Sequence, residues 1–425
     1  HTNQLPTLTP PFGPDSHLFR QDTDAWLASV STLYGATLRQ QCKVEGLRFD
    51  ADRVTMRLGP GEEVSCDFLI DAGGMRSHVA TLLGLRDATP RFRTDTRTLY
   101  THMIGLPPTD ALLTGDPGVP SPLSEGTMHH VFDGGWMWII PFQNHRDATN
   151  PLTSVGLMLD RRKHPALQGS PAEDFHRIIG RFPTIARQFA HATPIRPWIA
   201  SQRLQYSSPR TIGPRFVQLP HAAAFVDPLY SSGMSVLTVA IDLIAASLLP
   251  AVRERRYEEA RFEPVERVVQ DGFDHYDQIV ARSFDAFADY DVWNAWNRNW
   301  IMGNFLGTFG TLSTLVHYLH TGDRAWLDRS TDPSRIGVLG SHLPEVVAAM
   351  HANGELVDRF AAGDLAARDA ADGIFQRLGA LDFLPPYMGF GDPGQRCPAC
   401  FTLQEGARHV RSEEHTSELQ SPCNL

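Results

Sequence analysis

The sequence is poor in cysteine and has no excess of positive charge. Five of the 425 residues are cysteines, too few and too widely spaced for a disulfide framework, so a reducing compartment fits. Acidic residues outnumber basic residues by 48 to 38, which gives a formal net charge of −10. This balance argues against a protein whose main task is to neutralise nucleic-acid phosphates, and no nucleic-acid partner is expected.

Long, uninterrupted apolar runs are also lacking. The longest apolar stretch, residues 236–252, carries Asp242 near its middle and Pro250 near its end. It predicts a buried helix rather than a bilayer span, which needs about 20 apolar residues. No charged and then apolar leader lies at the start of the chain, and nothing indicates secretion. We therefore expect a cytoplasmic protein with no membrane partner.

The composition is that of an ordinary folded enzyme. Hydrophobic residues make up 42% of the chain and charged residues 20%, beside 34 Gly and 31 Pro, which excludes collagen-like, coiled-coil and wholly disordered proteins. At roughly 100–200 residues per domain, the length fits two domains or one large composite domain. A metal site is not expected, because the C-P-A-C string at Cys397–Cys400 has no second cysteine pair to complete a zinc site.

Periodicity divides the chain into a strand-rich part and a helical C-terminal third. Residues 22–35 combine acidic capping residues, helical apolar spacing and a final Gly, which predict a helix. Three β-rich runs predict a small antiparallel meander, and residues 98–160, with an Asp-Gly-Gly turn at 133–135, predict a second, mixed sheet. The runs of the meander are 37–45, 53–58 and 64–70, and the helical stripes are 242–249, 257–274 and 285–304.

Two short motifs and one corner could carry chemistry. In Trp136-Met-Trp138-Ile-Ile-Pro141, strand alternation places both indoles on one face, as a wall or as ordinary core packing. In residues 225–233 (FVDPLYSSG), Pro, Ser and Gly precede an apolar helix whose first N–H groups and dipole favour an anion. Helix capping by either serine explains the serines but not the whole string. A strand-to-helix corner, Asp71-Ala-Gly-Gly, suits a ligand but is more often structural.

The two motifs, in this order, resemble the paired signatures W-x-W-x-I-P and F-x-x-P-x-x-S-x-G of the flavin-dependent halogenases. The resemblance includes residues 17–24 (HLFRQDTD), 67–74 (DFLIDAGG), 135–145 (GWMWIIPFQNH) and 283–300 (SFDAFADYDVWNAWNRNW). Within this tryptophan halogenase superfamily, it points to the free-phenol, phloroglucinol-type members and covers about residues 12–386. The implied fold is α/β and flavoprotein monooxygenase-like: a Rossmann-type FAD domain, here without its N-terminal βαβ unit, with a mixed substrate sheet and a C-terminal helical region.

The resemblance also divides the chain into segments. It implies a partial FAD-binding domain at 12–90, a substrate-sheet region at 91–205, an FAD- and halide-binding segment at 206–252 and a helical C-terminal region at 253–390. Residues 411–425 resemble the in-frame translation of a sequencing-library adapter, so we leave this tail out of the fold.

For function, the resemblance implies FADH₂- and O₂-dependent halogenation through hypohalous acid, with chloride or bromide as the halide. The halide site falls on Ser232 and Gly233, whose backbone N–H groups can hold an anion. Trp136 and Trp138, in the motif that Pro141 completes, are expected to separate the flavin from the substrate. The positions that match cofactor contacts are Arg20, Asp71, Asp227, Pro228 and Met234.

The expected substrate is an electron-rich phenolic or resorcinolic small molecule. Tyr230 occupies the place where tryptophan halogenases have a Glu that assists an unactivated indole carbon, and a phenol is already activated by its hydroxyl. The aromatic residues expected around the substrate are Tyr230, Phe284, Phe287, Trp293, Trp296 and Trp300. As a bare pattern, the spacing of the three tryptophans on one helix face is more often core packing.

Two departures from the family pattern concern cofactor and catalysis. His221 occupies the position where the flavoprotein string G-D-A-A-G-F has an Asp near the FAD ribityl or pyrophosphate. No G-x-G-x-x-G loop and no match for the catalytic Lys are present, and neither Lys43 nor Lys163 lies in a matching context. The resemblance implies that both belong to a preceding segment of about a hundred residues. No catalytic residue is therefore assigned in this chain, and the fragment is expected to be inactive.

Two other functions remain open. An FAD-dependent aromatic hydroxylase or monooxygenase would share the fold and Asp71 but lack the tryptophan pair. A non-catalytic aromatic-binding remnant would keep a cavity without redox chemistry. The expected partners of a halogenase are its small phenolic substrate and a separate flavin reductase that supplies FADH₂, within secondary metabolism such as antibiotic biosynthesis. A homodimer is compatible with the sequence.

Overall fold

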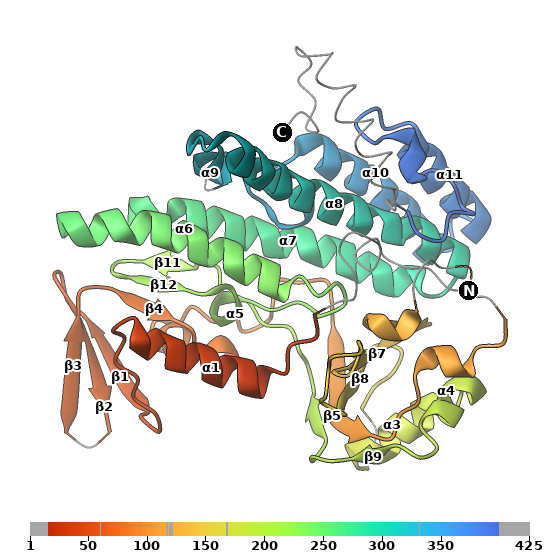
Figure 1. Ribbon diagram of the computed structural model, residues 1–425, viewed down its shortest axis with the longest axis horizontal. Helices are drawn as coiled ribbons and strands as arrows, with labels where there is room; N and C mark the ends of the chain where they lie inside the picture. The colour runs from red at the N-terminus through yellow and green to blue at the C-terminus, as the bar shows by residue number, and fades with distance from the viewer. Residues whose placement is uncertain are drawn as a thin grey trace.

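The computed structural model describes residues 16–59, 61–115, 118, 122–166, 169–330 and 332–398 (Figure 1). The Pro-rich start and the adapter-like tail at 411–425 lie outside the described residues. The strands are β1 (Val44–Phe49), β2 (Val54–Leu58), β3 (Glu62–Cys66), β4 (Leu69–Asp71), β5 (Thr96–Ile104), β6 (Met128–Phe132), β7 (Gly135–Pro141), β8 (Thr153–Asp160), β9 (Thr193–Pro194), β10 (Ile199–Ser201), β11 (Ile212–Gly213) and β12 (Phe216–Gln218). The α-helices are α1 (Arg20–Leu33), α2 (His78–Leu82), α3 (Pro171–Ile179), α4 (Pro183–Gln188), α5 (Pro220–Ala223), α6 (Gly233–Glu254), α7 (Glu263–Ala286), α8 (Tyr290–Thr321), α9 (Ala325–Ser330), α10 (Pro344–Ala361) and α11 (Ala367–Gly379).

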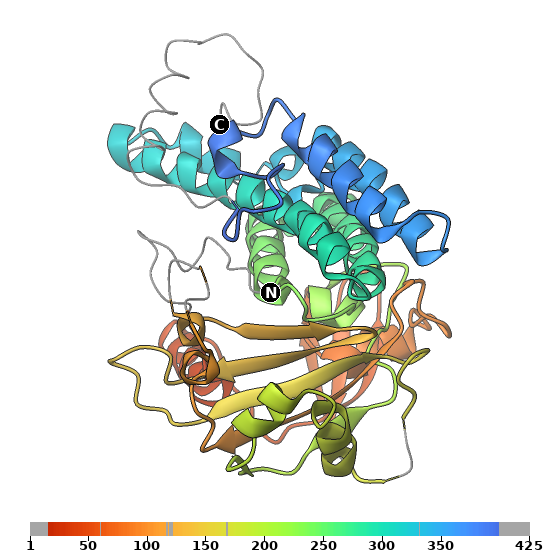
Figure 2. The same ribbon diagram turned by 90° about the vertical axis from the view of Figure 1, so that its right-hand side faces the viewer.

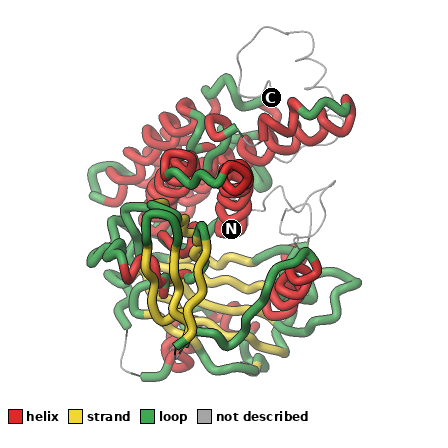
Figure 3. Tube along the Cα trace, turned by 90° about the vertical axis from the view of Figure 1, so that its left-hand side faces the viewer, coloured by secondary structure: helices red, strands yellow, loops and turns green. Residues whose placement is uncertain are grey.

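Helices and strands form separate layers. The long C-terminal helices cover one face of the six-stranded sheet, and α3 and α4 lie on its other face (Figure 2). Figure 3 shows the same separation, with most helices above the strands. The larger hydrophobic core lies between the sheet and the long helices and contains Trp136 and Met158. The smaller core lies on the side of α3 and contains Leu157 and Phe175, since neighbouring strand residues point to opposite faces.

The six-stranded sheet has the order β10-β5-β8-β7-β6, with β9 paired to the end of β5. The expected mixed sheet is wrong in this detail, because every described pairing in it is antiparallel. The reason is local: β6 and β7 form the expected hairpin through Asp133 and Gly134, and β7 then pairs with the next strand, β8. Short connections of this kind reverse the chain, whereas parallel neighbours need a long crossover.

The predicted meander is confirmed as β1-β2-β3, but its first and third runs are wrong in extent. The first strand begins at Val44, so residues 37–43 are outside it. The third run divides, because β4 leaves the meander and pairs in parallel with β12, far along the chain. Apolar alternation does not reveal which sheet a strand joins.

The apolar stretch at 236–252 lies in α6, which is longer and less buried than predicted. By length and composition alone, Gly233–Glu254 could cross a membrane, and 28% of its most apolar window is buried. Met234, Ile241 and Leu249 are 45%, 46% and 57% exposed. The expectation of a buried helix is therefore right only for the face that carries residues such as Val236 and Leu243.

Candidate functional site

A cavity of about 670 Å³ lies where the start of α1, the six-stranded sheet, the segment 225–234 and α7 meet. This volume is in the usual range for small-molecule and cofactor sites. Six of the predicted site residues line it, namely Arg20, Asp227, Pro228, Ser232, Gly233 and Met234. Further lining residues are His17, Phe19, Tyr100, His102, Ile140, Ser154, Arg196, His221 and Tyr276.

The segment before α6 is folded by its own hydrogen bonds. The Leu229 N–H donates to the Asp227 carboxylate at 3.0 Å, and the Ser231 N–H donates to the Pro228 carbonyl at 3.0 Å. Ser231 has φ of 52°, in the left-handed region that residues other than glycine rarely adopt. Proline followed by this turn directs the chain into the start of α6.

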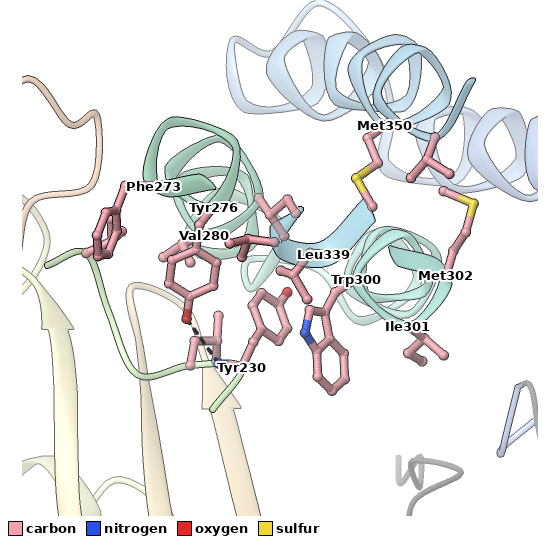
Figure 4. Close-up of a cluster of buried hydrophobic side chains, with 14 of the residues drawn as sticks. Tyr230, Phe273, Tyr276, Val280, Trp300, Ile301, Met302, Leu339 and Met350 are labelled. Carbon is pink, nitrogen blue, oxygen red and sulfur yellow. Dashed lines mark hydrogen bonds between the residues drawn. The ribbon is translucent and has the colours of Figure 1, made fainter. Parts of the chain in front are cut away.

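Tyr276 of α7 holds the same segment from the other side. Its hydroxyl donates to the carbonyl of Asp227 at 2.6 Å and accepts the N–H of Tyr230 at 3.5 Å. Figure 4 shows the contact with Tyr230 as a dashed line. Because Tyr276 is only 5% exposed, these bonds are shielded from water and fix the loop on the helix.

The first turn of α6 is the anion-receptive part of the site. Ser232 is the N-cap residue but makes no side-chain capping bond, so simple capping does not explain it. The first N–H groups of a helix have no partner within the helix, and the helix dipole favours negative charge there. A Cβ at Gly233 would lie 3.1 Å from Nε2 of His221, so glycine keeps this close approach free.

A buried carboxyl group lies beside this turn. Burial raises the pKa of Asp227 to about 7, while hydrogen bonds from Leu229 and Thr96 oppose the shift. The Thr96 hydroxyl donates to Asp227 at 3.3 Å. The indole N–H of Trp136 also lowers this pKa slightly, but no hydrogen bond of normal geometry forms there among the described residues.

The two tryptophans of β7 lie side by side on the face of the sheet that meets the long helices. Their ring centroids are 5.6 Å apart. Trp136 is 1% exposed, and the indole N–H of Trp138 donates to the Ser154 hydroxyl at 3.2 Å. Neither indole lines the cavity, but Ser154 and Tyr100, which contact Trp138, both do. The pair thus lies directly behind the cavity wall.

The string that begins α1 is tied to the tryptophan strand. Nδ1 of His17 lies 2.5 Å from the carbonyl oxygen of Pro141, which joins the string at 17–24 to the tryptophan motif. Arg20, in the first turn of α1, forms an ion pair with Asp24 at 2.6 Å and keeps 59% of its side chain exposed. Its guanidinium also approaches the Met234 sulfur at 3.9 Å.

Asp71 has a different environment from the other predicted cofactor residues. Its carboxylate accepts the Gly73 N–H at 2.7 Å and bonds to the Ser77 hydroxyl, so it braces its own strand-to-helix corner. It is 8% exposed and is not among the residues that line the cavity.

The six predicted substrate-pocket aromatics are joined in one cluster. The rings of Tyr230 and Trp300 stack at 4.7 Å, and Tyr230 shares the Ser283 hydroxyl with the indole N–H of Trp296. The Tyr230 and Trp293 rings are 6.5 Å apart. From Trp293 the ring contacts continue to Phe287 and Phe284.

This aromatic cluster is closely packed rather than open. Tyr230, Phe284 and Trp296 are 6%, 2% and 1% exposed. None of the six side chains lines the 670 Å³ cavity. The indole N–H of Trp300 is buried without a hydrogen-bond partner among the described residues, which a polar group on a ligand could satisfy.

Sequence reasoning missed several cavity residues. Tyr276, Tyr100, His102 and Arg196 come from three different parts of the chain and match no motif quoted above. Tyr100 and His102 alternate along β5 and therefore share the face of the sheet that carries Trp138. Only the strand pairing reveals this shared face, because Tyr100 and Trp138 lie on either side of the same residue, Gly156 of β8.

Comparison with known proteins identifies the family to which the chain is similar. The family model described as tryptophan halogenase matches residues 3–304. Monodechloroaminopyrrolnitrin halogenase PrnC of Pseudomonas fluorescens is 37% identical over 382 residues, which cover 90% of this chain and 67% of that protein. Tetracycline 7-halogenase of Kitasatospora aureofaciens is 38% identical over 384 residues, covering 90% and 69%.

Among solved structures, halogenase PltM in complex with phloroglucinol and FAD superimposes with a TM-score of 0.85. The two sequences are 30% identical, and the match covers 90% of this chain and 77% of that one. A second crystal structure of halogenase PltM superimposes with a TM-score of 0.85 at 29% identity, and the match covers 93% of this chain and 81% of that one.

Proposed function

The chain belongs to the tryptophan halogenase family of flavin-dependent enzymes, and we propose that it halogenates an electron-rich phenolic small molecule. Its fold is that of the FAD-binding halogenases, with α/β layers and a helical C-terminal region. Family membership makes it an oxidoreductase that uses FAD, and its named relatives act in antibiotic biosynthesis.

One observation carries the proposal. The start of α6, where Ser232 and Gly233 can bind a halide, opens into the cavity. The tryptophan pair lies directly behind the wall of the same cavity. An anion there would accept hydrogen bonds from backbone N–H groups that the Ser232 side chain leaves uncapped. Chloride and bromide are the ions we assign to this seat.

The residues around the cavity fit the ring end of FAD. Gly233 has no side chain to block a planar ring, and Pro228, Met234 and Arg20 border the same space. Reduced FAD, when bound, supplies the electrons that activate O₂ for halide oxidation. The described residues would position the halide beside it, and the buried ring of Trp136 with the partly buried ring of Trp138 would keep water and substrate away from it.

The substrate proposal rests on the aromatic cluster and on Tyr230. Tyr230 lies in the motif and stacks on Trp300, so a carboxylate is not available at that position to assist an unactivated ring. Phenols react readily with hypohalous acid, so an electron-rich substrate of this kind does not need that assistance. The phloroglucinol bound to PltM supports the same class.

The proposal extends to partners and location. A separate flavin reductase would supply FADH₂, as the resemblance to the flavin-dependent halogenases implies. A cytoplasmic location is favoured by the low cysteine content of the sequence. A homodimer is the assembly we would test first by light scattering.

The test uses the protein expressed from its complete reading frame. Purified protein is mixed with FAD, a flavin reductase, NADH, O₂, bromide and resorcinol, and the products are analysed by mass spectrometry. We expect bromoresorcinol, identified by its paired bromine isotope peaks. Hydroxylated resorcinol without bromine would instead favour a monooxygenase and overturn the proposal.

A further inference from the structure

His221 lies against the start of α6. It belongs to the short helix α5, lines the cavity, and its Nε2 and Cε1 atoms would be 3.1 and 3.2 Å from a Cβ placed on Gly233. Its backbone carbonyl accepts the Tyr206 hydroxyl at 2.5 Å, and its ring lies 5.6 Å from that of Phe225. These contacts hold the imidazole edge beside the proposed halide seat.

The charged groups packed around His221 are basic or ion-paired. Arg20 of α1 lowers the pKa of His221, after the larger effect of burial, and Arg20 is paired with Asp24. Arg86 bonds to the carbonyls of Ala222 and Ala223 on α5 itself. Both arginines keep their charge throughout the physiological pH range.

The remaining neighbours do not change charge in that range. Burial raises the pKa of Tyr206 to about 12, and the hydrogen bond from Arg20 lowers the pKa of Asp24. From α6, Gly233 and Met234 contribute no titratable group. Compared with these neighbours, the imidazole of His221 is therefore the group that gains charge as the pH falls.

We propose that His221 is part of the halide site, where its protonated imidazole adds a positive charge beside the N–H groups of Ser232 and Gly233 and tightens halide binding. This inference rests on the proposed function and names a residue that determines halide affinity at that same site. An aspartate at this position would place a negative charge there and oppose the anion.

Thermodynamic linkage fixes the size of the effect. If halide binding raises the pKa of His221 by one unit, the protonated protein binds halide tenfold more tightly than the neutral protein. Burial and Arg20 lower this pKa in the free protein. The gain in halide affinity therefore develops at pH values below the ordinary pKa of histidine and is absent at pH values above it. Affinity should therefore rise as the pH falls from about 8 to about 5.5.

Three other carboxyl or imidazole groups line the same cavity. Burial raises the pKa of Asp227 to about 7, so its negative charge also disappears on acidification. Burial lowers the pKa of His102, on β5, which lies on the sheet side of the cavity. His17 also lines the cavity, at the start of the α1 segment. Variants at these positions separate their contributions from that of His221.

The experiment measures chloride binding by chloride NMR line broadening at constant ionic strength, with gluconate as the replacing anion. The protein expressed from its complete reading frame is compared with His221→Asn, and with the control variants Asp227→Asn, His102→Asn and His17→Asn. We expect affinity to increase, by at most about tenfold, from about pH 8 to about pH 5.5 in the parent protein. The increase should be smaller in His221→Asn, should vanish when His221→Asn is combined with Asp227→Asn, and should still be present in the three control variants.

A second measurement needs no variant. Histidine ring NMR signals, recorded over the same pH range with chloride or with gluconate, give the pKa of His221 directly. Chloride should raise that pKa, and exposed His351 serves as the reference ring, whose signals should be the same in chloride and in gluconate. An unchanged pKa of His221, or an equal pH dependence in Asp227→Asn with and without His221→Asn, would overturn the inference.

Failure of this inference is distinguishable from failure of the proposed function. Bromoresorcinol formed by a protein whose chloride affinity is independent of pH would remove His221 from the halide site and leave the enzyme a halogenase. Lack of any bromoarene would overturn the function itself, whatever the chloride titration shows.

Discussion

Replacing Tyr276 by Phe removes one hydroxyl from the loop that precedes α6. That hydroxyl donates to the Asp227 carbonyl at 2.6 Å and accepts the Tyr230 N–H at 3.5 Å. Tyr276→Phe would leave the carbonyl without this buried donor, while the ring still fills its place against Tyr230. The change therefore isolates hydrogen bonding from packing.

The loss of stability expected for Tyr276→Phe follows from the burial of the hydroxyl. A buried polar group that loses its partner costs about 1–3 kcal/mol, whereas a hydrogen bond replaced by water costs about 0.5–1.5 kcal/mol. Since Tyr276 is 5% exposed, we expect Tyr276→Phe to lower the free energy of unfolding by about 1–3 kcal/mol. The left-handed Ser231 (φ 52°) is held less firmly, so chloride affinity should fall as well.

Urea unfolding followed by tryptophan fluorescence measures the first effect, and chloride NMR line broadening measures the second. Tyr34→Phe is the matched control, because Tyr34 is 89% exposed and the same hydroxyl is removed far from the loop. A loss of less than about 0.5 kcal/mol in Tyr276→Phe, with chloride binding equal to that of the control, would refute the idea that this hydroxyl fixes the halide loop.

Three further predictions concern the same site. Gly156→Ala would place a Cβ against the Trp138 ring, so overpacking should cost about 1–3 kcal/mol and shift the tryptophan fluorescence maximum. Gly233→Ala would bring a methyl group to 3.1 Å from Nε2 of His221, and weaker chloride broadening should result; equal broadening would contradict the assigned seat. For Asp227, whose folded pKa is raised to about 7 from 3.8, the parent protein should lose stability as the pH rises from about 4 to 7, because unfolding releases a proton in this range. Asp227→Asn should lack this loss in urea unfolding at several pH values, and parallel curves would exclude an ionisable Asp227.

Much of the site was predictable where it is continuous in the chain. Residues 227–234 form the loop and helix start that the motif predicts, and six predicted residues line one cavity. The hairpin at 133–135 and the paired faces of Trp136 and Trp138 follow from alternation alone. The roles assigned to the six aromatics and to Asp71 stay predictions, although the structure joins those aromatics in one packed cluster.

The errors arose where partners are distant in sequence. The run at 64–70 divides because β4 pairs with β12, in which Val217, about 150 residues later in the chain, lies opposite Ile70. The sheet is antiparallel because of which strands become neighbours, and α6 is half exposed because α7 covers only one side of it. Apolar periodicity records that a residue is buried but not against which element.

By itself, the sequence determined the local conformations and the chemical types present: an indole pair on one strand face, and a Pro-Ser-Gly turn that opens the N-terminus of a long helix. Those features depend on φ/ψ preferences and on residue spacing, which act over a few residues. Only the tertiary structure decided that Tyr276, His221 and Tyr100, from three separate elements, line the cavity into which that turn opens. Such meetings depend on how layers pack around a shared core, and this packing is a property of the whole chain.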